Sequence, residues 1–343
     1  MDFHPTEEQA AAVGLAARIF SDLATHERLA ATGTGSDAEL WKALTAAGLT
    51  AAVEEIGLLG LVLLLEEQGR TTAQVPYAAT CTYGILPVAA HGSAEQRARL
   101  LPALGSGDAV ATGAFPARGR FTAEDGRLTG TAPAVPWLRD ATHVLVPDAE
   151  RALWLVRTDA PGVRTSPVET TAPWSAGRLV LSGAAAERIG SDGAYEHTLA
   201  AARTAFAGLQ AGVCAGSLAR AVEYTSTREQ FGRPLSTNQG VMLRAADAYM
   251  DTEAIRVTTY EAAWRIDQGL EAYEHALTAA WWASEAGKRV VHAGQHLHGG
   301  MGADLDHPVH RHFLWGRQLD AYLGSGSELL AELGASIAEG EQA

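Results

Sequence analysis

Arg228 lies where a predicted helix ends, and an arginine in that position is suited to bind an anion. It opens the segment Arg-Glu-Gln-Phe-Gly-Arg-Pro, which runs to Pro234, and the helix that carries Tyr224 should stop at the glycine and the proline. A planar guanidinium group beside such a break is typical of phosphate recognition. A salt bridge at a helix end would give the same local pattern, so the segment alone leaves both interpretations open.

A glycine-rich loop downstream, His298-Gly-Gly-Met-Gly302, favours the anion-binding interpretation. Glycine has no side chain, so the backbone of such a loop can approach a ligand closely. The loop is followed by Asp306, Pro308 and a basic cluster. The cluster consists of Arg311, His312 and Arg317. Arg228 is therefore not an isolated candidate.

Two further patterns match known ligand sites but lack the surroundings that those sites need. The segment from Gly33 to Ala38 fits a dinucleotide fingerprint, which requires a buried strand before it and a βαβ unit around it. A polar helix end precedes it here, so a glycine loop and a helix cap are expected. His307, His310 and His312 suggest a metal, but no cysteine or carboxylate completes a ligand set. We expect no metal site, and polar surface or interface histidines instead.

Composition and charge disfavour several classes of function. The formal net charge of −14 disfavours a nucleic-acid partner, which needs a clustered positive surface. The N-terminus is too acidic and polar for a secretory signal, and the longest apolar stretch, Ile56–Leu65, is half the length that spans a bilayer. Cys81 and Cys214 form no disulfide framework, as expected for reduced thiols. A cytoplasmic protein without nucleic-acid or membrane partners is predicted.

Helix signals dominate the first segment, residues 1–107. Three pairs have the capping-box pattern, in which a hydroxyl and a carboxylate or amide satisfy the free N–H groups of a first turn. The pairs are Thr6 with Gln9, Ser36 with Glu39, and Ser93 with Gln96. Each precedes a run rich in alanine and leucine with helical spacing, so an all-α domain is predicted.

The middle segment, residues 108–190, has the character of short strands. Its β-prone runs are separated by Gly, Pro, Asp and Thr. The runs are Thr142–Val146, Ala152–Val156 and Arg178–Leu181. They predict a small antiparallel β domain.

Longer helices are predicted in residues 191–343. Small and apolar residues recur there with a period of about 3.5, as in a tightly packed helix bundle. This seam comprises Val241, Ala245, Ala248, Thr252, Ile255, Thr259, Ala262 and Ile266. Upstream, Gly208, Gly212 and Gly216 recur every four residues, which allows another helix to approach closely.

Across essentially the whole chain, these features resemble the acyl-CoA dehydrogenase family. Together the matching segments make a strong resemblance. They are Phe3–Gln9, Leu40–Trp41, Ala47–Leu49, Glu66–Arg70, His91–Pro102, Arg228–Gly232, Gln239 and Gly299–Gly302.

The resemblance implies an α+β, mainly α fold with an N-terminal helical domain, a small central β domain and a C-terminal four-helix bundle. It also implies FAD as cofactor and an acyl-CoA thioester as substrate. The family's reaction removes a proton from the acyl Cα and passes a hydride from Cβ to the flavin, which needs a carboxylate base. An electron-transfer flavoprotein is then a candidate electron acceptor.

The two positions that carry the base in this family hold apolar residues here. One position, just before a Gly-Ser pair, is Leu323, and the other, one residue before Arg203, is Ala202. The flavin-contacting segments of the family's β domain are best matched by Ala134–Pro136 and Ala114–Pro116, whose side chains offer no hydroxyl. The resemblance therefore implies no catalytic residue in this chain and an altered flavin-ring pocket.

The family residues that reach across to the FAD of a neighbouring subunit are retained, with a histidine where many members have a glutamine. By resemblance they are Arg228, Gln230, Phe231, Gln239, His296, Gly299 and Gly300. This pattern implies a non-catalytic subunit of an α2β2 heterotetramer, whose homologous partner supplies the glutamate and shares one FAD per pair. The run Gln295–Arg311 is most similar to the short subunits of bacterial steroid side-chain dehydrogenases, which implies a bulky acyl-CoA.

Two other interpretations stay open. An active homo-oligomeric flavoenzyme would need a displaced base, for which Asp320 and Glu328 are the nearest carboxylates. Losing a general base costs about 10²–10⁴-fold in rate, so a partner that supplies one is the simpler hypothesis. The second alternative is a structural or binding protein without FAD, which the retained Arg228 segment disfavours.

Overall fold

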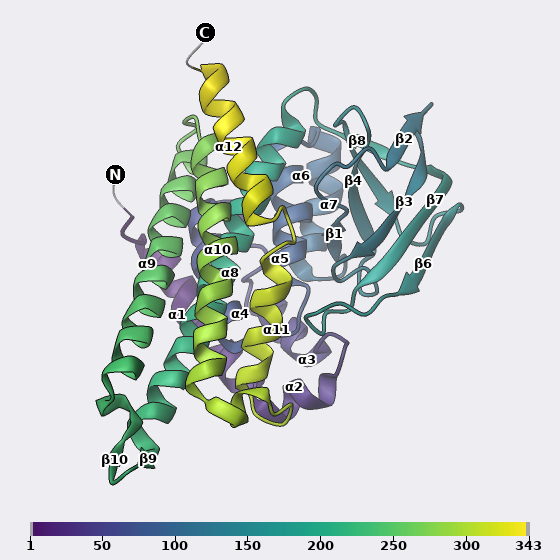
Figure 1. Cartoon of the computed structure of the whole chain (residues 1–343). Coiled ribbons are helices and arrows are strands. Elements are labelled where there is room, and N and C mark those ends of the chain that lie inside the picture. The colour runs from purple at the N-terminus through teal and green to yellow at the C-terminus, as the bar shows by residue number, and fades with distance from the viewer. Residues whose placement is uncertain (1–2, 341–343) are drawn as a thin grey trace. The chain divides into compact units, whose positions relative to one another are not determined.

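Helices form the first and last parts of the chain, and small sheets form the middle, in a computed structural model that describes residues 3–340 (Figure 1). The first helices are α1 (Glu7–Leu23), α2 (His26–Thr32), α3 (Ala38–Ala46), α4 (Val53–Thr71), α5 (Tyr77–Thr80), the π-helix η1 (Cys81–Ile85), α6 (Leu86–His91) and α7 (Ala94–Ser106). The later helices are α8 (Ala194–Thr227), α9 (Gln239–Asp267), α10 (Tyr273–Leu297), α11 (Val309–Leu319) and α12 (Gly326–Gly340). The predicted fold class is confirmed.

The described chain divides into two compact units. The bundle unit contains residues 3–4, Val62–Ala73 and the described chain from Arg203 onward. The sheet unit contains Pro5–Leu61 and Gln74–Ala202. Every residue that resembles a cofactor-binding residue lies in the bundle unit. The domain boundaries after residues 107 and 190 remain predictions.

Two of the three predicted capping boxes are confirmed. The Thr6 hydroxyl accepts a hydrogen bond from the N–H of Gln9 at 3.2 Å, and the Gln9 side chain accepts one from the N–H of Thr6 at 3.0 Å. Ser93 and Gln96 form the same reciprocal pair at the start of α7. These pairs fix where α1 and α7 begin.

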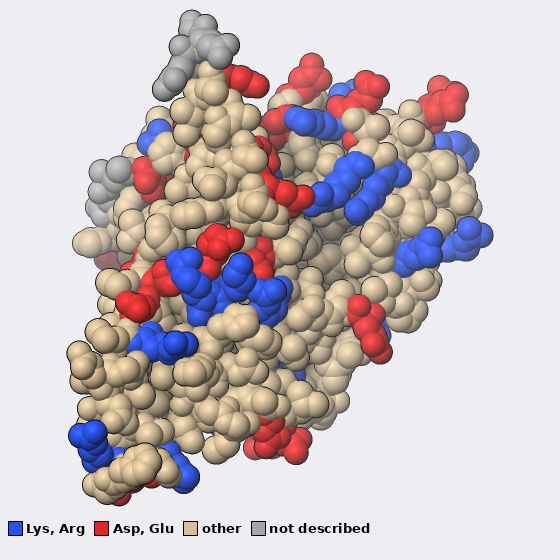
Figure 2. Space-filling model, in the orientation of Figure 1, with Lys and Arg blue, Asp and Glu red and all other residues tan. Residues whose placement is uncertain are grey.

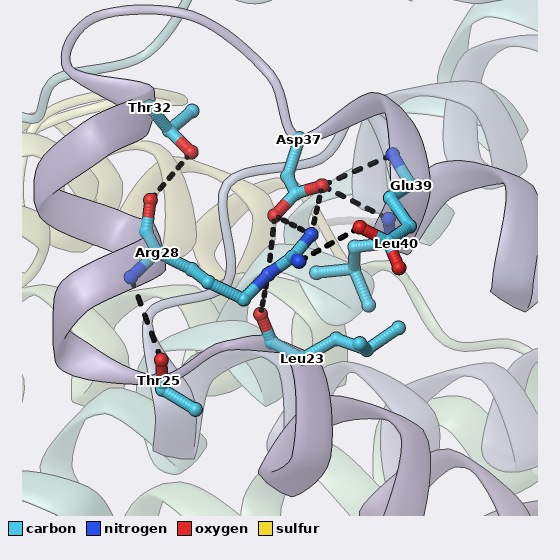
Figure 3. Close-up of polar contacts among 7 residues, drawn as sticks. All are labelled: Leu23, Thr25, Arg28, Thr32, Asp37, Glu39 and Leu40. Carbon is cyan, nitrogen blue, oxygen red and sulfur yellow. Dashed lines mark hydrogen bonds and ion pairs between the residues drawn. The ribbon is translucent and has the colours of Figure 1, made fainter.

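The third prediction is wrong, because Asp37 rather than Ser36 caps helix α3 (Figure 3). The Asp37 carboxylate accepts from the N–H groups of Glu39 and Leu40, both at 3.0 Å. Arg28 donates to both oxygens of the same carboxylate at 2.8 Å. An aspartate offers two acceptor oxygens and a charge that attracts Arg28, so it outcompetes the neighbouring hydroxyl.

Two four-stranded sheets make up the β part of the sheet unit. One has the order β1 (Ala111–Gly113), β4 (His143–Pro147), β5 (Leu153–Arg157), β8 (Glu187–Ile189), and the other β2 (Phe121–Glu124), β3 (Arg127–Val135), β7 (Gly177–Ala185), β6 (Val163–Pro167). The predicted strand runs are confirmed in β4, β5 and β7. The prediction of a purely antiparallel unit is wrong, because β1 pairs in parallel with β4 after the chain has crossed through the other sheet.

Alanines form the core of the C-terminal helix bundle. The predicted seam of α9 is confirmed, since its central residues, from Ala248 to Ala262, are buried at every seam position. They pack with α8 and α10 in one cluster. Its members are Ala207, Ala211, Cys214, Ala248, Ile255, Ala262, Ala279, Ala283, Ala286, Val290 and Ala293. Small side chains let these helices lie close together.

The predicted glycine stripe of α8 brings that helix against the second half of α4. A Cβ atom at each glycine would collide with the backbone of α4 or with a side chain on it. The nearest approaches would be 2.9 Å for Gly208 to Val62, 2.1 Å for Gly212 to Glu66 and 2.3 Å for Gly216 to Arg70. Glycine is therefore required along this contact.

Among the described residues, α8 is the helix that is long and apolar enough to cross a membrane, with a mean hydropathy of 1.2 over its best window. Of that window, 78% is buried inside the protein, as expected of a core helix. The apolar stretch Ile56–Leu65 lies outside this helix and is too short to span a bilayer, as the sequence predicts.

Candidate functional site

The segment after Arg228 folds into a tight hairpin at the end of helix α8 (Figure 1). Strands β9 (Glu229–Gln230) and β10 (Arg233–Pro234) pair antiparallel. The two turn residues, Phe231 and Gly232, have φ angles of 57° and 76°. Two positive φ angles are typical of the type I′ turn, whose twist matches that of the paired strands.

Phe231 occupies the tip of this hairpin. Its residue surface is 99% exposed, and neighbouring Gln230 is exposed as well. A left-handed backbone costs a non-glycine residue about 1–2 kcal/mol, and nothing within the described chain compensates by packing on the ring. The tip therefore displays a large apolar side chain that makes no packing contact within the described chain.

The backbone of Arg228 is fixed while its side chain is exposed. Its N–H donates to the carbonyl of Tyr224 at 2.8 Å, and its own carbonyl accepts from the N–H of Leu235 at 2.9 Å. Within residues 3–340, no hydrogen bond or ion pair engages the guanidinium group. The salt-bridge interpretation of the sequence is therefore wrong for the described chain, and the guanidinium group remains available to an anion.

The glycine-rich loop after α10 forms the short 3₁₀ helix η3 (Gly299–Ala303). Gly299 has a φ of 62°, a left-handed backbone angle that favours glycine at this position. A Cβ on Gly300 would meet nothing within 4 Å, whereas one on Gly302 would lie 2.3 Å from the carbonyl of Gln295. The fold thus requires Gly302 but not Gly300, which leaves an open, exposed backbone at Gly300.

The hairpin and the loop meet at one end of the bundle. The ring of Tyr224, in the last turn of α8, stacks on His298 with centroids 4.9 Å apart. Gln239 begins α9 and His296 lies in the last turn of α10, and both are exposed. We call residues 228–239 and 296–300 the hairpin end. All seven predicted cofactor residues lie there, and Figure 2 shows basic side chains at its tip.

The basic cluster and the three histidines downstream do not form a single site. His310 contacts the carbonyl of His307 at 2.6 Å, and Arg317 pairs with Asp320 at 2.6 Å. Within the described residues, no three histidine, cysteine or carboxylate side chains are grouped to hold a metal. His310 and Arg317 are therefore engaged in separate local contacts.

His312 corrects the prediction of surface histidines, because it is buried. Its Nε2 lies 3.0 Å from the carbonyl of Arg70, and its ring covers Gly216. Burial lowers the pKa of His312 to about 4, and the charges of Arg220 and then Arg311 act in the same direction. Burial also lowers the pKa of Arg311, to about 10.

A small cavity lies further along the bundle unit, and we call it the Leu323 cavity. Its volume is about 20 Å³, which is space for about one water molecule. Side chains from α8, from the loop before α12 and from the first turn of α12 line it. They include Arg203, Phe206, Gln210, Tyr322, Leu323 and Leu329. The rings of Phe206 and Tyr322 meet edge to face at 4.8 Å.

Sequence comparisons agree with this architecture. Residues 6–108 match the acyl-CoA dehydrogenase N-terminal domain, and residues 193–337 match the C-terminal domain of the same family. Acyl-CoA dehydrogenase FadE27 of Mycobacterium tuberculosis is 36% identical over 99% of both chains. This chain belongs to the acyl-CoA dehydrogenase family.

Solved structures of the family superpose over nearly the full length. A chain of the Tcur3481-Tcur3483 steroid ACAD is 42% identical, with a TM-score of 0.93 over 98% of this chain and 99% of that one. A chain of the ChsE4-ChsE5 complex from Mycobacterium tuberculosis is 34% identical, with a TM-score of 0.92 over 99% of each. Butyryl-CoA dehydrogenase from Megasphaera elsdenii, 23% identical with a TM-score of 0.87, shares the fold.

Leu323, which by resemblance occupies one of the family's two base positions, lines the Leu323 cavity. Leu323 is buried there, and Ala202, at the alternative position, is buried on α8. The two carboxylates that are nearest to Leu323 in sequence are already engaged. Asp320 accepts from Arg317 at 2.6 Å, and Glu328 accepts from the N–H of Ser325 at 2.9 Å as part of a helix cap. None of these groups is placed as a free base.

The sheet unit fills the region that resembles the flavin-contacting segments. The ring of Phe115 stacks on Tyr83 at 5.0 Å and on Tyr195 at 5.8 Å. The carbonyl of Pro136 accepts a hydrogen bond from Thr112 at 2.5 Å. Residues of the chain itself therefore occupy the surroundings of Ala114–Pro116 and satisfy Pro136.

Two charged networks in the bundle unit escaped the sequence analysis. Glu66 on α4 is buried and accepts from Arg256 at 2.9 Å and from the hydroxyl of Tyr260 at 2.6 Å. Burial raises the pKa of Glu66, while Arg256 opposes that shift. The second network joins Arg203 to Glu332. No local spacing indicates either pair, because the partners are far apart in sequence.

Proposed function

We propose that this chain is the non-catalytic subunit of an α2β2, FAD-dependent acyl-CoA dehydrogenase. Its hairpin end completes the FAD site of a homologous partner that carries the glutamate base. The observation that carries the proposal is the contrast within the bundle unit. Arg228 offers an unengaged guanidinium group, while the base position, Leu323, faces a cavity with room for about one water.

The hairpin end fits the phosphates of FAD better than the sheet unit fits the flavin ring. Arg228 would donate charge-assisted hydrogen bonds to the pyrophosphate, and the open backbone at Gly300 would allow close approach. Gln230, Gln239 and His296 would add donors around it. FAD, when bound, supplies the hydride acceptor, and this chain's residues hold and orient it.

Exposed apolar side chains support a protein partner on helix α9. Five of them recur at helical spacing, and all are more than half exposed. They are Met242, Leu243, Tyr249, Met250 and Val257. An adjacent groove of about 690 Å³ between α9 and α10 mixes apolar and charged walls, as a rim of an interface does. A homologous subunit with a matching bundle is the proposed occupant.

The proposed substrate class is a bulky, steroid side-chain type of acyl-CoA, with an electron-transfer flavoprotein as electron acceptor. The steroid part rests on likeness to the Tcur3481-Tcur3483 steroid ACAD. A cavity of about 20 Å³ on this side excludes an acyl chain, so the whole acyl group would lie in the partner's half of the pair.

The test is flavin content and mass of the chain purified alone and then co-expressed with a glutamate-bearing homologue. We expect a colourless chain alone and a yellow heterotetramer with about one FAD per pair. Replacing the partner's glutamate with glutamine should abolish flavin reduction by acyl-CoA, whereas Glu328→Gln in this chain should leave it unchanged.

A yellow homo-oligomer that reduces its flavin with an acyl-CoA would overturn the proposal in favour of the displaced-base alternative. A heterotetramer without flavin would favour the structural alternative. The geometry of Asp320 and Glu328 argues against the first, because both carboxylates already serve local hydrogen bonds.

A further inference from the structure

Arg203 places a buried cation next to one of the two base positions of the family. Its residue surface is 5% exposed, and its guanidinium group donates to both oxygens of Glu332 at 2.8 Å and 2.7 Å. The Tyr273 hydroxyl donates to the same carboxylate at 2.5 Å. Three helices, α8, α10 and α12, are therefore joined at one carboxylate.

Helix α12 is fastened on both sides of this carboxylate. Leu329, on the side nearer the helix start, packs against Leu277 and Ala280 of α10. On the other side, the Ser336 hydroxyl donates to Glu274 at 3.1 Å. The contacts recur along one face of α12, so the helix lies along α10 over much of its length.

This arrangement forms one side of the Leu323 cavity. Arg203 and Leu329 line the cavity directly, and Glu332 and Tyr273 hold Arg203 in place. Gln210 forms another wall, and its buried Oε1 has no hydrogen-bond partner among the described residues. A cavity of about 20 Å³ with a polar wall suits one water molecule rather than part of an acyl chain.

We infer that Arg203, Glu332 and Tyr273 form a latch that holds α12 across this chain's own counterpart of the acyl site and keeps it shut. The inference rests on the proposed function, because the family's base positions locate that site. Burial first, and the Glu332 hydrogen bond second, raise the pKa of Tyr273 to about 12, so the hydroxyl keeps its proton at neutral pH.

Hydrogen exchange of the purified heterotetramer tests the latch. Glu332→Gln removes the charge that binds Arg203, and we expect amide exchange in residues 326–340 to become at least about tenfold faster. Tyr273→Phe removes one donor, and a smaller, roughly two- to fivefold increase is expected. Glu339→Gln is the matched control on the same helix, because its side chain is exposed and engages no described residue.

Equal exchange in Glu332→Gln, Tyr273→Phe and the control would overturn the latch. A second measurement counts a non-reducible acyl-CoA analogue in the wild-type complex by native mass spectrometry. One analogue per pair supports a closed site, and a second, seen in the Leu323 cavity by crystallography, would overturn it. FAD content is measured on the same sample. Two FAD per pair would contradict the proposed function, while the exchange result would still decide the latch.

Discussion

Helix α8 connects two regions of opposite character. Arg228 follows its last residue and belongs to the hairpin end, where side chains are exposed and Phe231 faces outward. Arg203 lies 24 residues before that last residue, Thr227, or about 36 Å along the helix, in a region closed by an ion pair and packed rings. One end leaves its side chains exposed, and the other is filled by the chain itself.

The difference between the two regions has an energetic reason. A cavity that no longer binds a ligand destabilises a fold by about 24 cal/mol per Å³, so side chains that fill it are favoured. Leu323, Phe206 and Tyr322 line the Leu323 cavity and leave little of its space empty. Arg228 and Phe231 at the hairpin end, by contrast, have exposed side chains, which supports the proposed role of this end toward a partner.

The largest expected effect comes from disrupting the contact between helices α8 and α4, because α8 carries both regions. Gly212→Ala would place a Cβ 2.1 Å from the carbonyl of Glu66, and a backbone clash of that size should destabilise the chain by about 3 kcal/mol or more. Thermal unfolding should show the loss. Gly14→Ala is the control, because its Cβ meets nothing within 4 Å in helix α1 and should stabilise by about 0.5–1 kcal/mol.

The next-largest expected effect tests the hairpin end alone, through its affinity for FAD. Arg228→Ala in the heterotetramer should weaken FAD binding by about 10- to 150-fold, since a charge-assisted hydrogen bond contributes about 1.5–3 kcal/mol. Flavin fluorescence titration gives the dissociation constant. Arg233→Ala on the same hairpin, whose side chain bonds Asn238 at 3.1 Å, should change that constant less than about threefold. Unchanged FAD affinity in Arg228→Ala would remove the hairpin end from the cofactor site.

His312, which is buried against Gly216 in α8, should make the stability of the chain depend on pH. The pKa of His312 is about 4 in the folded chain, against about 6.5 when exposed. Between those pH values the unfolded chain binds a proton at His312 that the folded chain does not bind. The contribution of His312 to the free energy of unfolding is therefore full above pH 6.5 and is lost as the pH falls toward 4.

From pH 7 to pH 5 the loss should be about 2 kcal/mol in the free energy of unfolding. Other histidines with lowered pKa values add losses of the same sign. They are His91, His143, His197 and His292. Urea unfolding of wild type and His312→Gln at both pH values isolates the part from His312. Parallel losses in the two proteins would show that His312 does not titrate on unfolding.

Local sequence patterns predicted the helices and strands well, but they could not predict ion pairs between residues far apart in the chain. The start of α9 at Gln239, the buried seam from Ala248 to Ala262 and the stop of α8 near Arg228 all follow from spacing and turn residues. The exposed end could therefore be located from sequence, although its role remains a prediction.

The closed region could not be located in the same way. Arg203 and Glu332 are 129 residues apart, and Glu66 and Arg256 are 190 apart, so no periodicity relates them. Adjacent caps also compete, and Asp37, which caps α3 in place of Ser36, is paired with Arg28 of the preceding helix. Sequence patterns report which groups are near in the chain, while burial of a charge requires a partner from anywhere in the fold.

The smallest expected effect tests whether the hairpin end reaches a partner at all. Phe231→Ala should raise the dissociation constant for the homologous subunit by about tenfold, because truncating a buried aromatic contact at an interface typically costs more than about 1 kcal/mol. The unfolding free energy of the isolated chain should stay unchanged, since the ring is 99% exposed there. Leu270→Ala, at the α9–α10 turn and 46% exposed, is the matched control and should leave association unchanged. If Phe231→Ala and Leu270→Ala associate equally well, the left-handed aromatic tip serves no interface, and Arg228 must reach its anion without that anchor.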